Sequence, residues 1–142
     1  MILKVNKKIS EIKKLNQIII PEDFFRNQLN YIVSTELLKH VISNQNAPII
    51  TYGELAAKIS SDFNPRNLNV YLGNVSEICQ ENGFPLISSI VVNKDTKLPG
   101  DGFYKAFYNE KPISEWENIF NKCKSEVINC IWWEKLLNAI ES

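Results

Sequence analysis

Apolar residues recur at intervals of three and four along three stretches of the chain, a spacing typical of helices that bury one face. The first stretch, 21–43, opens with a proline and two acidic residues, which favour the first turn of a helix. The second stretch is 64–83. The third, 114–140, opens with a Ser-x-x-Glu capping box at Ser114. The pattern therefore predicts a long helix in each stretch.

Stronger local signals lie between the first and third helices. Thr51 and Glu54 form another capping box, which predicts a short helix ahead of the second long one. Asn64, followed by a proline, starts that second helix, and Gly83 ends it by accepting a left-handed conformation. Two helices so closely joined suggest a helix-turn-helix in which the second helix recognises DNA.

The residues after the second helix change to the pattern of a strand and a hairpin. A run of β-branched and apolar residues spans 87–92 and predicts a strand. The Leu-Pro-Gly-Asp-Gly sequence at 98–102 predicts the return of a hairpin rather than a ligand loop. The segment 48–50 supplies a short strand ahead of the first turn helix. The expected fold is therefore α+β, with a winged helix-turn-helix core at 49–104 between long N- and C-terminal helices.

The length and composition are those of one globular domain. Of 142 residues, 44% are hydrophobic and 23% are charged. We predict a single domain over 21–142, with the C-terminal helix at 114–140, preceded by a basic arm or edge strand at 1–20. Because the sequence shows neither an apolar run of membrane-spanning length nor a signal-peptide pattern, we expect a cytoplasmic protein without membrane contact.

The charge balance argues against nucleic-acid binding. Sixteen basic and sixteen acidic residues give a net charge of zero. Residues 1–20 carry five lysines against one glutamate, whereas 106–142 carry six glutamates against four lysines. The summed field therefore gives no strong attraction to DNA.

The side chains that usually hold metals or perform catalysis are few. Cys79, Cys123 and Cys130 lack Cys-x-x-Cys spacing, and we expect them to be reduced structural thiols. His40 is the one histidine, and we interpret it as a partly exposed surface residue rather than a base. Zinc normally needs four donors. We expect no metal, no cofactor and no catalytic residue, so an enzyme is the least favoured function.

Five short sequences fall within residues 51–95: Thr51-Tyr52-Gly53-Glu54-Leu55-Ala56, Pro65-Arg66, Leu72-Gly73, Pro85-Leu86-Ile87 and Val91-Val92-Asn93-Lys94-Asp95. Together they resemble the winged-helix domain of the alkylguanine-DNA alkyltransferases and alkyltransferase-like proteins. The resemblance implies a DNA-binding domain. In that family a Pro-Cys-His-Arg tetrad precedes the Val-Val pair. Here Ile87-Ser88-Ser89-Ile90 stand in its place, so the thiol that accepts the alkyl group is absent, and an unassisted serine is no substitute.

A second resemblance rests on Val91-Val92-Asn93-Lys94 and Leu98-Pro99-Gly100-Asp101-Gly102-Phe103. This pattern is similar to that of small bacterial winged-helix modules, which occur alone or beside restriction-type nucleases and other defence proteins. It implies a module rather than a reaction.

The first hypothesis is a non-catalytic protein that binds double-stranded DNA, in a bacterial or phage defence or mobile-element setting. Asparagine can pair with adenine, arginine with guanine, and lysine with phosphates. The expected DNA-binding residues are Arg66, Asn67, Asn69, Tyr71 and Asn74 on the second helix and Lys94 and Lys97 in the wing.

The second hypothesis is a protein-interaction module, such as an adaptor or an inhibitor of a defence complex. Its motivation is the neutral charge, the acidic C-terminal third and the adjacent Trp132 and Trp133. The two rings cannot point at the same neighbour, so we expect one in the core and the other partly exposed. Exposed tryptophan is enriched in binding hot spots, so the C-terminal helix is a candidate surface for a protein partner or a homodimer.

Overall fold

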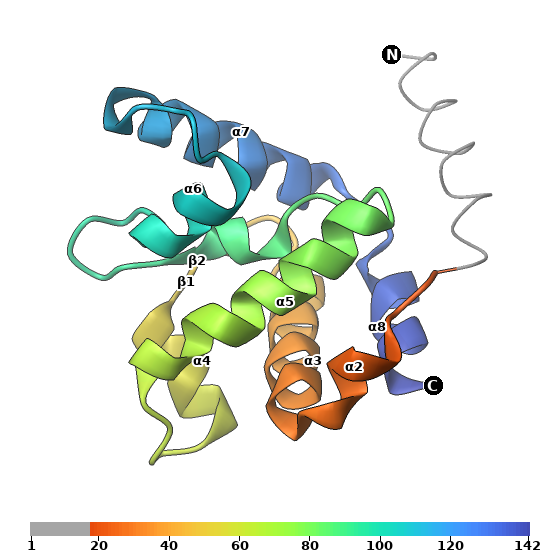
Figure 1. Ribbon diagram of the computed structural model, residues 1–142. Coiled ribbons are helices and arrows are strands. Elements are labelled where there is room, and N and C mark those ends of the chain that lie inside the picture. Colours follow the sequence, from red (N-terminus) through yellow and green to blue (C-terminus); the bar gives the residue numbers. More distant parts are fainter. Residues whose placement is uncertain (1–17) are drawn as a thin grey trace.

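The computed structural model describes residues 18–142, and helix dominates this part of the chain (Figure 1). Of the described residues, 66% are helical and 3% are in strands. The elements, in chain order, are α2 (Glu22–Arg26), α3 (Gln28–Ser43), β1 (Ile50–Thr51), α4 (Tyr52–Ile59), the 3-10 turn η2 (Pro65–Asn67), α5 (Leu68–Glu81), the 3-10 turn η3 (Ile87–Ile90), β2 (Val91–Val92), α6 (Asp101–Phe107), the 3-10 turn η4 (Ile113–Glu115), α7 (Trp116–Asn129) and α8 (Trp133–Glu141). The predicted α+β class is therefore wrong. The arm predicted at 1–20 lies outside the described residues, apart from its last three.

The predicted winged core is also wrong. A wing is an antiparallel hairpin, whereas β1 and β2 pair in parallel, with Ile50 opposite Val91 and Thr51 opposite Val92. Most of the predicted strand forms η3, and the expected hairpin return leads into α6. The apolar run was misleading because its side chains are buried all round, and a fully buried 3-10 turn gives the same continuous pattern as a buried strand.

The main core is built around α3, which packs against α5 and α8 (Figure 1). Trp133, at the start of α8, is only 1% exposed and stacks on Phe84 at 5.6 Å between ring centroids. Its indole Nε1 donates to the carbonyl oxygen of Val127 at 3.0 Å. The other large side chains that are fully buried include Leu37, Leu38, Leu55, Leu68, Ile87, Ile90, Leu136 and Ile140.

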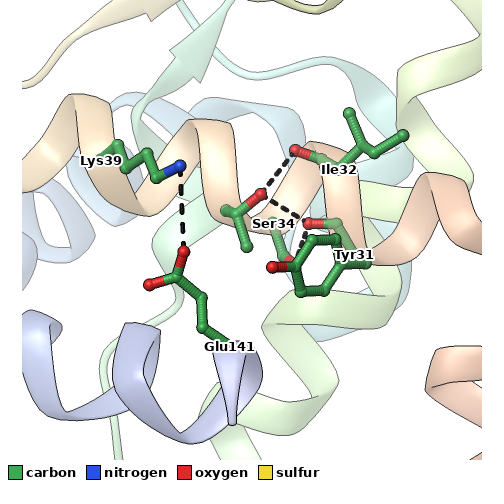
Figure 2. A network of polar contacts seen from close by, with 6 residues as sticks. Tyr31, Ile32, Ser34, Lys39 and Glu141 are labelled. Atoms are coloured by element: carbon green, nitrogen blue, oxygen red, sulfur yellow. Dashed lines mark hydrogen bonds and ion pairs between the residues drawn. The ribbon is translucent and has the colours of Figure 1, made fainter.

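Two buried hydroxyl side chains of α3 form hydrogen bonds with carbonyl oxygens of the same helix (Figure 2). The hydroxyls of Ser34 and Thr35 donate to the carbonyl oxygen of Tyr31 at 3.1 and 2.8 Å. Lys39 reaches Glu141 of α8 with 3.9 Å between Nζ and Oε2. Both ends of that ion pair are partly exposed, so it contributes little to stability.

The first and third predicted helices are each broken in two. The break in the first lies at Asn27, whose side chain accepts from the amide of Leu29 and caps α3. The third stops at Asn129, where Gln45 Nε2 caps the helix end by donating to the carbonyl oxygens of Ile128, at 2.8 Å, and of the C-cap residue Cys130, at 2.9 Å. The predicted capping box at Ser114 is absent too, since that residue lies within η4 and makes no cap.

A second, smaller apolar cluster joins α6 and α7. Tyr104 stacks on Trp116 with 4.2 Å between centroids and 5° between planes. Phe103 and Cys123 complete the buried part of the cluster. Helix α6 lies beside α5 (Figure 1), and residues of both helices line the candidate site.

Candidate functional site

A groove lies between two walls. One wall is the N-terminal half of α5, and the other is α6 together with the turn that precedes it. Its deeper part, of about 90 Å³, is lined by Tyr52, Asn69, Leu72, Gly73, Ser88, Gly102, Phe103, Ala106 and Phe107. Its shallower part, of about 190 Å³, is lined by Tyr52, Pro65, Arg66, Asn69, Asn93 and Gly100. Tyr52 and Asn69 line both parts, so the two hollows adjoin.

The two predicted N-caps position the walls of this groove. Thr51 and Glu54 form the full capping box, with 3.1 Å from the Glu54 amide to Thr51 Oγ1 and 3.0 Å from the Thr51 amide to Glu54 Oε1. Asn64 Oδ1 accepts from the amide of Arg66 at 3.0 Å and starts η2, which leads into α5. These local signals, both confirmed, therefore fix where Tyr52 and Arg66 stand.

Tyr52 joins α4 to the turn that precedes α6. Its hydroxyl oxygen accepts from the backbone amide of Gly100 at 2.9 Å. A Cβ at Gly100 would lie 3.3 Å from that oxygen, so the close approach favours glycine there. Burial raises the pKa of the Tyr52 phenol above its usual value, although the Gly100 hydrogen bond acts in the opposite direction. The phenol therefore stays protonated at neutral pH and can donate into the groove.

Ser88 forms the floor of the deeper part and is 5% exposed. Ser76 Oγ donates to Ser88 Oγ at 2.6 Å, and the Ser88 amide donates to Ser76 Oγ at 3.0 Å. The Ser88 hydroxyl proton is left to donate to a ligand. His40 does not assist, since its Nε2 donates to the carbonyl oxygen of Pro48 at 2.9 Å. Ser88 can therefore form hydrogen bonds, but it has no base to make it a nucleophile.

Two glycines in the groove wall are required by neither conformation nor packing. Gly73 of α5 and Gly102 of α6 do not have positive φ, and a Cβ at either would meet no heavy atom within 4 Å. Within a helix, glycine is less favourable than alanine by about 0.8–1.0 kcal/mol. Because Gly73 and Gly102 carry no side chain, they leave open space in the groove.

The sequence-predicted DNA-binding residues fall into two groups. Arg66 and Asn67 are exposed in η2, and Asn69 is exposed on the first turn of α5. Lys94 and Lys97 are exposed in the turn after β2. Arg66 and Asn69 line the groove, and Asn93, next to Lys94, lines the same hollow.

The remaining predicted residues point elsewhere. Tyr71 is half-buried against the main core. Asn74 Nδ2 donates to Asn30 Oδ1 of α3 at 2.9 Å, which turns it away from the groove. Of the tryptophan pair, Trp132 is half-buried and Trp133 lies in the core, as expected for one of the two. Trp133 is therefore not available at the surface.

Sequence reasoning missed Tyr52 as a lining residue, together with Gly73 and Gly102. The capping box placed Tyr52 at a helix start, but the bond to Gly100 crosses 48 residues of sequence. The signal in the sequence is that no turn or helix end requires a glycine at Gly73 or Gly102. That both line one groove follows only from the packing of α5 against α6.

The charges along α5 are segregated. Arg66 lies at its N-terminal end, next to the lysine-bearing turn. Glu77 and Glu81 lie at its C-terminal half, where they line a separate hollow of about 260 Å³ with Asp23. The turn beside the groove carries Asp95 between Lys94 and Lys97, and Asp101 follows at the start of α6, so the positive charge at this end of α5 rests mainly on Arg66.

Comparison with known proteins found no match, since neither a family model nor a curated protein nor a solved structure matches the chain. Within residues 18–142, no three His, Cys, Asp or Glu side chains gather as metal ligands. Cys79, Cys123 and Cys130 are all buried thiols rather than half-cystines. In the same part of the chain no helix has the length and apolarity to span a bilayer.

Proposed function

We propose that this chain binds double-stranded DNA, without catalysis, through the groove beside the N-terminal half of α5. The observation that carries the proposal is the combination of open space, hydrogen-bond donors and nearby cations at one place. Arg66 and Asn69 line its shallower part, and Tyr52 and Ser88 line its deeper part.

These groups suit the chemistry of DNA. The Asn69 amide can pair with adenine, the Arg66 guanidinium can pair with guanine or contact a phosphate, and Lys94 and Lys97 can contact phosphates. The acidic residues of α5 lie away from this end. The overall neutrality of the chain is thus compatible with a local anion-binding surface.

The resemblance to the alkyltransferases, whose winged core this chain lacks, motivates a role for Ser88. Ser88 stands where that family has its alkyl-accepting cysteine, and Ser88 lies on the floor of the groove. A serine without a base retains the hydrogen bonding of such a site and loses its group transfer. We therefore propose a binding role for Ser88, and a setting in bacterial or phage defence remains part of the hypothesis.

Three cations imply weak, salt-sensitive binding. With about 0.9 counterions released per phosphate contact, three contacts give a slope of about −2.7 in log affinity against log salt. Raising the salt from about 50 to about 200 mM should then weaken binding about 40-fold. A dimer or a partner protein would add contacts.

A protein partner is the second candidate, and one observation favours it. Ile131, in the connection between α7 and α8, is 74% exposed, and the half-buried Trp132 is its neighbour. An exposed isoleucine beside a tryptophan is a plausible contact for another protein or a second copy of this chain. Ile131→Ser, tested by size-exclusion chromatography and pull-down, addresses this candidate.

The test of DNA binding is fluorescence anisotropy with a labelled random duplex at both salt concentrations. Arg66→Ala and Asn69→Ala should weaken binding, and Arg66→Ala should also reduce the salt slope by about 0.9. Lys122→Ala is the matched control, because Lys122 is exposed on α7 and lines a different hollow. Absence of binding at about 50 mM salt would refute the proposal for this chain.

A further inference from the structure

The turn that carries the two lysines is fastened at both ends to consecutive residues at the start of α4. At its beginning, β2 pairs with β1, which places Val92 opposite Thr51. At its end, the amide of Gly100 donates to the hydroxyl oxygen of Tyr52, the residue after Thr51. The turn is thus anchored at the start of α4, and the segment that follows α4 carries Arg66.

The turn is itself closed by hydrogen bonds. The Asn93 amide donates to the carbonyl oxygen of Leu98 at 2.9 Å, and the Lys97 amide donates to that of Asn93 at 2.8 Å. Lys97 has a φ of 59°, a conformation that a lysine rarely adopts unless the surrounding bonds hold it. Since these bonds close the turn on itself, it should shift as a unit if one of its anchors is lost.

We infer that Tyr52 is a positioning residue for DNA binding: by holding Gly100, its hydroxyl fixes Lys94 and Lys97 in register with Arg66 and the groove. This inference rests on the proposed function. Fixed cations contact several phosphates of one duplex together, whereas a loosened turn would leave two of the three cations free to move out of register. The predicted cost falls on phosphate contacts, so it should appear in the salt dependence of binding.

The first test is Tyr52→Phe, which keeps the ring in place and removes the bond to Gly100. In the proposed function, Lys94→Ala with Lys97→Ala lowers the salt slope by about 1.8. We expect Tyr52→Phe alone to lower it by about 0.9 or more. In the Tyr52→Phe background, removal of both lysines should lower it by less than about 0.9, because the contacts are already impaired.

Two further variants separate positioning from other roles of Tyr52. Gly100→Ala keeps the hydroxyl but places a Cβ 3.3 Å from it, so it should reproduce the loss of slope. Tyr108→Phe is the matched control, because it removes the hydroxyl contact with Cys123 Sγ in the α6–α7 cluster and leaves the turn untouched. It should leave the slope unchanged.

The outcomes are distinct. If wild type binds DNA and the effects of Tyr52→Phe and of the lysine substitutions on the slope simply add, Tyr52 acts by direct contact or through stability alone, and the inference is wrong. The same holds if Tyr52→Phe lowers the melting temperature without moving the slope. If wild type fails to bind at about 50 mM salt, both the inference and the proposed function fall.

Discussion

Filling the groove should stabilise the protein and, if the proposed function holds, weaken binding of DNA. Gly73 lies within α5 and lines the deeper hollow, and a Cβ there meets no heavy atom within 4 Å. Gly73→Ala should therefore fit without strain and gain helix propensity of about 0.8–1.0 kcal/mol. For a chain of this size, a gain of about 1 kcal/mol corresponds to a rise of about 3 °C in melting temperature.

Under the proposed function, the same methyl group should lower the affinity for DNA, because it occupies space in the groove that the DNA would enter. Overpacking of a fitted site costs about 1–3 kcal/mol, which is about 5- to 150-fold in affinity. Gly102→Ala, on the facing wall, should act in the same direction. The two measurements are urea unfolding, read from the midpoint at unchanged slope, and duplex anisotropy at about 50 mM salt.

Gly53→Ala provides the control. Gly53 is exposed near the start of α4, as Gly102 is near the start of α6, but it does not line the groove. It should alter stability and leave affinity unchanged. If Gly73→Ala stabilises the fold and binding is also unchanged, the groove is not the DNA site. If it destabilises the fold, the space beside Gly73 is not open.

Three further predictions concern the fold. Gln45→Ala leaves the part-buried carbonyl oxygens of Ile128 and Cys130 without this donor and should lower the free energy of unfolding by about 1–3 kcal/mol in urea titration; no loss would mean that water replaces the amide. Ser89 is fully buried and its hydroxyl has no hydrogen-bond partner, so Ser89→Ala should raise the melting temperature, and a clear fall would contradict this account. Burial raises the pKa of Tyr104 to about 12, so the native protein keeps a proton that the unfolded chain loses near pH 10; the free energy of unfolding should fall as pH rises from about 10 towards 12, and Tyr104→Phe should reduce that fall.

The parts of the fold that depend on neighbouring residues could be predicted from the sequence. The capping box at Thr51, the cap at Asn64 and the left-handed Gly83, with φ of 78°, were all predicted correctly. Each is a property of a few adjacent residues, because a cap bonds amides only two or three positions away. Local chemistry therefore located α4 and α5.

The parts that depend on distant residues could not be predicted. Gln45 caps the end of α7 from more than 80 residues away, and Asn74, which we predicted to bind DNA, instead donates to Asn30. The strand pair is only two residues long, so periodicity could show neither its parallel direction nor the 3-10 turn before it. The groove has the same origin, since its walls come from helices that only packing brings together.

The zero net charge, which argued against DNA binding, is a sum over the whole chain. Charges on distant parts of the surface do not cancel each other's local field. At ordinary ionic strength charges interact over about 8–10 Å, so the acids of the C-terminal half of α5 screen little of the field around Arg66. They do restrict how a duplex can lie. A duplex along the whole of α5 would bring its phosphates against Glu77 and Glu81. If the chain binds DNA as proposed, we therefore expect the duplex to cross α5 near its N-terminal end, where the groove and the lysine-bearing turn also lie.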